Sequence, residues 1–191
     1  MNWGDAKIAW HDAFRGFVQE YDGPRYALKG NLGKIGFMFE AGKVQSVVAK
    51  IPQKPREWGM FCYAPDHGKT ERYKRRVADR LYCELLSETP DLAECRLKMT
   101  RFLILINLCI QERLVQQWSE NGAKWMASSE KADLLEIPRQ NWRRDGWWLT
   151  SNRIQNKLVI LCDQALRPVA RLCAEEREKI FTERETQRLT G

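Results

Sequence analysis

The hydrophobic positions of the first 65 residues change their period along the chain and predict one helix followed by two strands. Within residues 4–21 apolar side chains recur at helical spacing from Trp10 to Tyr21, and the helix-stopping sequence Asp22-Gly23-Pro24 follows. The runs KIGFMFE (34–40) and KVQSVVAKI (43–51) are rich in the β-branched and aromatic residues that favour strands. We therefore expect a β-hairpin that turns at Ala41-Gly42. For residues 56–68, REWGMFCYAPDHG, a further strand and an aromatic loop are equally compatible with the pattern.

From residue 66 onward the pattern is helical. The run RFLILINLCI (101–110) is apolar nearly all round, which predicts a central helix over residues 92–118 that is surrounded by other elements. Thr89-Pro90-Asp91 is typical of the start of that helix, and a short helix is expected over about 123–135. A last long helix follows, which we expect Pro168 to kink or to split in two. The apolar stripes of the first and last of these helices are Tyr73, Val77, Leu81 and Leu85, and Ile154, Leu158, Leu161 and Ala165.

These elements predict a mainly α fold: a helical bundle preceded by a small α+β lobe made of the N-terminal helix and the β-hairpin. The chain has 191 residues, of which 43% are hydrophobic, enough for one core with an appendage. We place the lobe at residues 1–65 and the helical domain at residues 66–191.

Residues 128–148, SSEKADLLEIPRQNWRRDGWW, have the pattern of a helix-turn-helix segment. Ala132 takes the place of the small residue in the first helix, Leu135 and Ile137 are the apolar residues around the turn, and Trp142 is the first core position of the second helix. The residues predicted to face outward are Arg139, Gln140, Asn141, Arg143 and Arg144. Arginine can bind guanine with two hydrogen bonds, glutamine and asparagine can do so with adenine, and further arginines can hold phosphates.

Three residues depart from the usual helix-turn-helix pattern. Glu136 stands where the turn usually has glycine, and Lys131 and Asp145 stand where apolar residues are usual. An ordinary loop between two bundle helices, with solvated arginines, is therefore the alternative interpretation.

The chain is basic, and its basic residues cluster a second time. With 32 Lys and Arg against 25 Asp and Glu, the formal net charge is +7, which attracts phosphate backbones and acidic proteins alike. The second cluster comprises Lys69, Arg72, Lys74, Arg75, Arg76 and Arg80. It can hold a phosphate backbone or an acidic partner, or it can be a solvated helix face.

No motif indicates catalysis, a cofactor or a small-molecule substrate. Gly68-Lys69-Thr70 looks like the end of a phosphate-binding loop, but Tyr63 stands where that loop needs its first glycine. The six cysteines form no CxxC pair and only two histidines are present, so we expect no metal site and reduced thiols, with Cys83, Cys95 and Cys109 acting as small core residues in helices. Neither a secretory signal nor a membrane span is apparent, so we expect a cytoplasmic protein of a bacterial host cell.

Two segments resemble the late-gene antitermination proteins of lambdoid phages, the Q-type family. They are WGMFCYAPDHG (58–68) and IPRQNWRRDGWW (137–148), each followed by helical sequence, and the resemblance covers roughly the C-terminal two-thirds of the chain. It implies a protein that contacts DNA near a late promoter and then travels with RNA polymerase, with Arg139, Gln140, Asn141, Arg143 and Arg144 as the DNA-reading set. The cysteine-rich zinc module of one branch is missing, so the resemblance is to the zinc-free branch, and residues 1–57 match no motif of the family.

The leading hypothesis is therefore a non-enzymatic transcription regulator that binds duplex DNA through residues 128–148 and touches RNA polymerase with another surface. The alternative is a structural subunit or inhibitor of a nucleoprotein complex, such as a CRISPR-type effector, that binds RNA or single-stranded DNA. A third hypothesis is a nuclease that uses scattered carboxylates and a metal ion.

Overall fold

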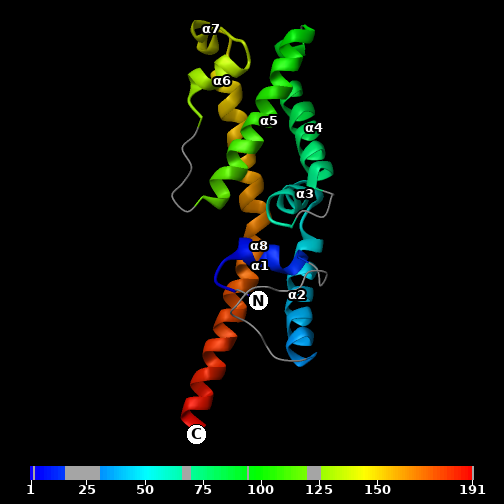
Figure 1. The fold of residues 1–191 in the computed structure, drawn as a ribbon, viewed down its shortest axis with the longest axis vertical. Coiled ribbons are helices and arrows are strands. Elements are labelled where there is room, and N and C mark those ends of the chain that lie inside the picture. The colour runs from blue at the N-terminus through cyan, green and yellow to red at the C-terminus, as the bar shows by residue number, and fades with distance from the viewer. Residues whose placement is uncertain (2, 16–30, 66–69, 94, 120–125, 191) are drawn as a thin grey trace. The chain divides into compact units, whose positions relative to one another are not determined.

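The computed structural model describes residues 1, 3–15, 31–65, 70–93, 95–119 and 126–190, and most of these residues lie in helices (Figure 1). No strand occurs in these ranges. The helices in chain order are α1 (Ala6–Phe14), α2 (Asn31–Lys50), α3 (Gln53–Cys62), α4 (Thr70–Glu88), the 3-10 helix η1 (Pro90–Ala93), α5 (Arg96–Trp118), α6 (Ser128–Leu134), α7 (Arg139–Arg144) and α8 (Trp147–Thr190). The predicted mainly α class is confirmed.

The predicted β-hairpin is wrong, because residues 34–50 of its two strands and turn lie within α2 and only Ile51 follows the helix. The buried residues of this region are Ala41, Val44, Val48 and Ile51, spaced three and four apart, as on one face of a helix. Gly42 is an exposed helical residue and not a turn. Residues 56–68 are neither the strand nor the loop that we considered: their first part belongs to α3, and 66–69 lie outside the described residues.

The first helix begins where the sequence predicts but is described only to Phe14. Asp5 caps it, because its carboxylate accepts a hydrogen bond of 2.7 Å from the Lys7 backbone N–H. Trp10 and Ala13 are buried as predicted. Residues 16–30, which contain the rest of the predicted stripe and its stop sequence, lie outside the described residues.

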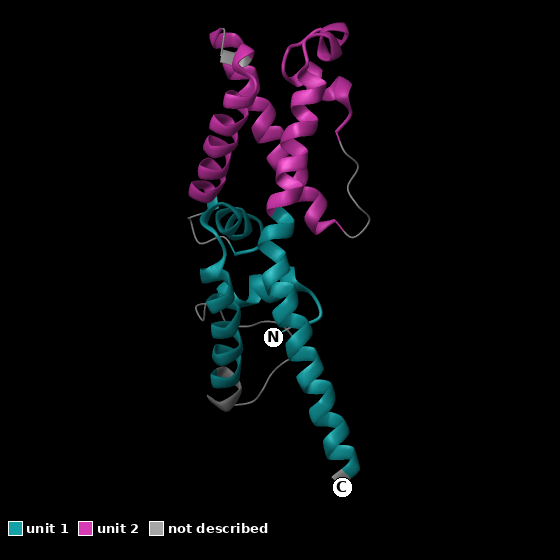
Figure 2. Ribbon diagram, turned by 180° about the vertical axis from the view of Figure 1, so that it is seen from behind, with its two compact units in different colours: residues 1–70, 162–191 teal, residues 71–161 magenta. Residues whose placement is uncertain are grey.

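The chain forms two compact units, which Figure 2 shows in different colours. Unit 1 contains Met1–Thr70 and Cys162–Gly191, and unit 2 contains Glu71–Leu161. Helix α8 therefore contributes residues to both units, whereas the sequence pattern predicts a single helical domain over residues 66–191. The predicted split at Pro168 is wrong, because Pro168 lies inside the continuous helix α8.

In unit 1, aromatic side chains hold α1 against α3. The Trp10 ring lies directly over Gly59, where an added Cβ would overlap it, and its centroid is 5.7 Å from that of Tyr63. The Trp58 Nε1 donates a hydrogen bond of 3.0 Å to the Cys162 Sγ, which joins α3 to this part of α8. These aromatic residues form the core of the unit.

In unit 2, α4, α5 and α8 bury most of the predicted apolar positions, although Tyr73 is half-buried and Ala165 is buried in unit 1. The Tyr82 and Phe102 rings, from α4 and α5, lie 5.4 Å apart, and the Lys157 ammonium of α8 lies 2.7 Å from carboxylate oxygens of both Glu84 and Glu88 on α4. The prediction that α5 is covered all round is wrong, because Leu103 and Ile104 are 39% and 41% exposed. The buried positions are Val77, Leu81, Leu85, Phe102, Leu105, Ile106, Ile110, Ile154, Leu158 and Leu161.

Candidate nucleic-acid interface

The turn between α6 and α7 has the geometry of a glycine-type helix cap, although it contains no glycine. The Ile137 backbone N–H donates to the Ala132 carbonyl at 2.9 Å, and that of Glu136 donates to the Asp133 carbonyl at 3.1 Å. Glu136 has φ 52°, the left-handed conformation that glycine adopts most easily. A guanidinium N–H of Arg101, on α5, donates to the Glu136 carbonyl at 2.7 Å. Glu136 therefore takes the conformation of the usual glycine, and α5 holds the turn in place.

The apolar residues of the turn lie where the helix-turn-helix pattern predicts. Ala132, Leu135, Ile137 and Trp142 are all buried. They anchor α7, which has only six residues and ends at Arg144. Gly146, with φ 75°, then leads into α8, whose first residue Trp147 is also buried. The arrangement is a short helix held on the surface of unit 2 by its own apolar side.

The charged residue at a usually apolar position, Lys131, is buried in an ion pair. Its Nζ lies 2.7 Å from the Oε2 of Glu112 on α5, and the two side chains are 7% and 6% exposed. Gln155, on α8, donates to the same oxygen at 2.7 Å. The backbone N–H of Met126 donates to the other carboxylate oxygen. A buried charge is tolerated when it is paired and hydrogen bonded, so this departure from the pattern fixes α6 to its neighbours.

Ser151 and Cys109 extend this polar cluster inside unit 2. The Ser151 Oγ lies 3.5 Å from the Lys131 Nζ and 3.8 Å from the Cys109 Sγ. Burial raises the pKa of the Cys109 thiol to about 11, against the opposing effect of the Lys131 charge. The thiol therefore stays protonated near neutral pH and is a poor nucleophile. The cluster acts as a structural joint between α5, α6 and α8.

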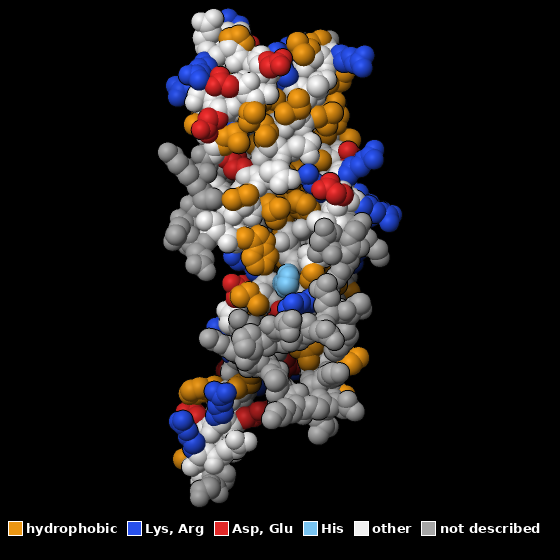
Figure 3. All heavy atoms as spheres, in the orientation of Figure 1, with side chains coloured by type: hydrophobic (Ala, Val, Ile, Leu, Met, Phe, Trp, Pro, Cys, Tyr) orange, Lys and Arg blue, Asp and Glu red, His pale blue; other side chains and the backbone are white. Residues whose placement is uncertain are grey.

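Two of the predicted outward arginines form ion pairs on the surface. The Arg139 Nη2 lies 2.7 Å from the Asp133 Oδ2, and its hydrogen bond holds the pKa of Asp133 below its usual range. The Arg144 Nε lies 2.8 Å from the Asp145 Oδ1, which raises the pKa of Arg144. The two arginine side chains are 70% and 68% exposed, so these pairs are solvated and contribute little to stability. Figure 3 shows basic and acidic side chains close together around α6 and α7.

The remaining members of the predicted set differ in exposure. Gln140 and Arg143 are exposed, as expected. Asn141 is half-buried, and its Oδ1 is a buried atom that meets no hydrogen-bond donor within the described residues. Asn141 is therefore the member of the set that is least available to a partner.

The second basic cluster lies on the first turns of α4 and does not join the α6–α7 surface. Arg72 and Arg75 are exposed and Arg76 is half-buried, whereas Lys69 lies outside the described residues. Both ribbon views place the first turns of α4 at the opposite end of unit 2 from α7 (Figures 1 and 2). The two predicted basic sets are thus two separate surfaces.

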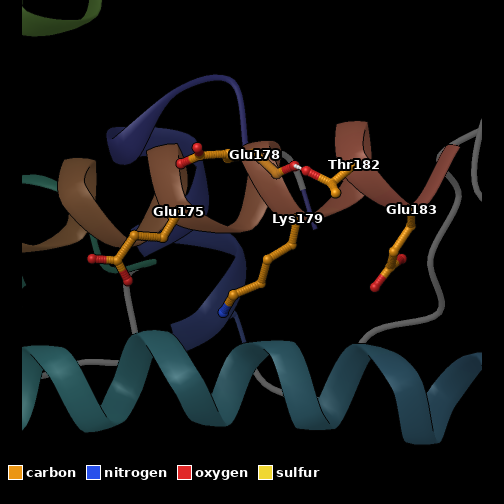
Figure 4. Close-up of a pocket in the computed structure, with 5 residues that line it drawn as sticks. All are labelled: Glu175, Glu178, Lys179, Thr182 and Glu183. Carbon is orange, nitrogen blue, oxygen red and sulfur yellow. Dashed lines mark hydrogen bonds between the residues drawn. The ribbon is translucent and has the colours of Figure 1, made fainter. Parts of the chain in front are cut away.

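Unit 1 has a shallow depression of about 500 Å³ along α8, lined by Glu175, Glu178, Lys179, Thr182 and Glu183 (Figure 4). All five residues belong to one helix, and the Thr182 hydroxyl donates to the Glu178 carbonyl at 3.0 Å, an ordinary intrahelical contact. The Lys179 Nζ lies 2.9 Å from Oε1 of Glu176, and the Lys43 Nζ of α2 lies 2.6 Å from Oε2 of the same residue. The charges here join α8 to α2 within unit 1.

The sequence pattern identified the α6–α7 turn but not the buried cluster beneath it. Glu112 and Gln155 are polar residues beside apolar stripes, but the contact of Glu112 with Lys131 spans 19 residues of sequence and that of Gln155 with Glu112 spans 43. No group of acidic, histidine and cysteine side chains among the described residues has the arrangement of a metal site. In the same ranges no helix has both the length and the apolar character needed to cross a bilayer.

Comparison with known proteins gives no identity for this chain, because no protein family model, no curated protein and no solved structure matches it.

Proposed function

We propose that unit 2 binds duplex DNA through the α6–α7 surface and that the chain is a non-enzymatic transcription regulator. One observation carries the proposal: buried Leu135, Ile137 and Trp142 anchor a short helix whose polar residues, except Asn141, are exposed. Those exposed residues are Arg139, Gln140, Arg143 and Arg144.

The chemistry of the surface favours directional contacts over long-range attraction. Residues 128–148 contain four basic and four acidic residues, so this segment alone attracts phosphates weakly. The net charge of +7 on the whole chain supplies the long-range attraction. Arginine and glutamine at the surface then supply the hydrogen bonds to base edges and phosphates.

The basic turns of α4 are a second surface in this proposal. Arg72 and Arg75 are exposed at the end of unit 2 opposite α7, so one short duplex need not reach both sets. An acidic protein partner suits this surface, and RNA polymerase is the partner that the resemblance to antitermination proteins implies. This part of the proposal is independent of the DNA contact.

Fluorescence anisotropy with the full chain tests the DNA contact. The probes are a randomised duplex of about two helical turns and its single strand. The variants are Arg143→Ala with Arg144→Ala, and a control with the same charge change on exposed α8 residues of unit 1, Arg184→Ala with Arg188→Ala. We expect the first double variant to bind duplex about tenfold or more weakly at moderate salt, and the control to bind like the wild type.

Equal affinities of the wild type and the α7 variant would contradict the proposal. If the chain instead binds the single strand more tightly than the duplex, independently of sequence, and loses this binding as the salt concentration rises, the result would support a subunit of a nucleoprotein complex.

A further inference from the structure

The Asp133 carboxylate binds one edge of the Arg139 guanidinium and leaves another edge open. Its Oδ1 accepts from Nε at 3.3 Å and its Oδ2 accepts from Nη2 at 2.7 Å. A guanidinium has five N–H donors in one plane, so Nη1 and the second hydrogen of Nη2 remain for another acceptor pair. With the side chain 70% exposed, that open edge is accessible from solvent.

This paired geometry distinguishes Arg139 from the other arginines of α7. Asp133 lies on α6 and Arg139 is the first residue of α7, so the two hydrogen bonds span a turn whose backbone is itself fixed. Arg144 has a single bond of 2.8 Å from its Nε to the adjacent Asp145. Among the arginines of α7, Arg139 is therefore the one whose guanidinium plane is fixed by two hydrogen bonds to one carboxylate across the turn.

We propose that Arg139 reads guanine with its open edge and that Asp133 is the positioning residue that orients it. The inference rests on the proposed DNA binding and names the base that the surface recognises. Guanine presents O6 and N7 in the major groove, an acceptor pair that matches two parallel guanidinium N–H donors. Lysine is not equivalent to arginine here, because an ammonium group has no rigid planar fork that can bind Asp133 with one edge and guanine with another.

Removing Asp133 distinguishes a carboxylate that orients Arg139 from one that only adds negative charge, because the two roles change DNA binding in different ways. A carboxylate beside DNA repels phosphates, so its removal raises affinity for any duplex. If Asp133 also orients Arg139, its removal lowers the preference for guanine at the same time. Asp145 supplies a matched control, because it carries the same charge on the same surface but makes only one bond, to a different arginine.

The test uses two randomised duplex pools, one with guanine and one with 7-deazaguanine, which lacks the N7 acceptor. Anisotropy competition with the full chain gives the ratio of the two affinities. We expect the wild type to prefer the guanine pool by about tenfold. Arg139→Lys and Asp133→Ala should bring that ratio close to one, whereas Asp145→Ala should keep it.

Three outcomes would overturn the inference while leaving DNA binding intact. The first is equal binding of the wild type to both pools, and the second is an unchanged affinity ratio in Arg139→Lys. The third is an affinity ratio that falls equally in Asp145→Ala and Asp133→Ala. Absence of wild-type binding to either pool would overturn the proposed function and this inference together. Far-UV circular dichroism of each variant checks that the helices are retained.

Discussion

Lys131 and Glu112 form an ion pair of 2.7 Å in the interior of unit 2, with less than a tenth of either side chain exposed. Gln155 adds a third element to the pair through its hydrogen bond to Glu112. The pair thus connects α6, α5 and α8 beneath the turn that presents the exposed arginines. The geometry of the candidate interface depends on this buried connection.

Replacing Lys131 by methionine should destabilise the protein strongly. The change leaves the buried Glu112 carboxylate without its counter-charge, which typically costs about 3–5 kcal/mol in the free energy of unfolding. Urea unfolding followed by circular dichroism measures the loss. The double variant Lys131→Met with Glu112→Gln removes both charges and should recover most of it. A single variant as stable as the wild type, or a double variant no better than the single, would contradict the buried pair.

Two helical glycines of unit 1 should respond to alanine in opposite directions. At Gly59 the added methyl group overlaps the buried Trp10 ring, so Gly59→Ala should lower the free energy of unfolding by about 1–3 kcal/mol. At Gly42 no atom lies within 4 Å of the added Cβ, so Gly42→Ala should raise it by about 0.5–1 kcal/mol. Thermal or urea unfolding of the two alanine variants and the wild type measures both changes in the free energy of unfolding. Equal effects would show that α1 does not pack on α3 as described.

Cysteine labelling checks the burial of the helices independently. The prediction that Cys83 and Cys95 are small core residues is wrong, because both are exposed, whereas that for Cys109 is confirmed. The other four cysteines are buried, and burial raises the pKa of Cys109 to about 11. Because the thiolate is the reactive form, a thiol reagent near neutral pH should label two cysteines quickly in the native chain and all six in denaturant. Cys83→Ser with Cys95→Ser should abolish the fast phase. Fast labelling of a third cysteine would contradict the packing of one of the cores.

The sequence predicted those parts of the fold in which local pattern and tertiary contact agree. Leu135 and Ile137, around the turn, and Trp142, in α7, are buried at the apolar positions of the helix-turn-helix pattern. Helical spacing was present at Ala41, Val44 and Val48, but β-branched and aromatic neighbours favoured strands, and packing within unit 1 overrode that local preference. The secondary-structure preference of single residues is therefore a weak predictor where the apolar positions of a segment fit both the helical and the strand spacing.

The buried cluster around Lys131 could not be predicted from the sequence for a different reason. Lys131 was recognised only as a misfit in the helix-turn-helix pattern, because a buried lysine requires a partner that the local sequence does not contain. Glu112 provides that partner from another helix. Similarly, the exposed ion pair between Arg139 and Asp133 depends on the angle between α6 and α7, which the left-handed conformation of Glu136 sets. The sequence therefore indicated the surface of the candidate site, and the structure supplies its orientation.

The dependence of DNA affinity on salt concentration tests the central claim most directly, because each phosphate contact releases bound cations from the duplex. The account predicts that Arg143→Ala with Arg144→Ala lowers the slope of log affinity against log salt by about 1–2 relative to the wild type, since each contact contributes about 0.9. Arg184→Ala with Arg188→Ala, which changes the net charge equally, should leave the slope unchanged. Identical slopes for all three proteins would show that α7 does not touch the DNA backbone.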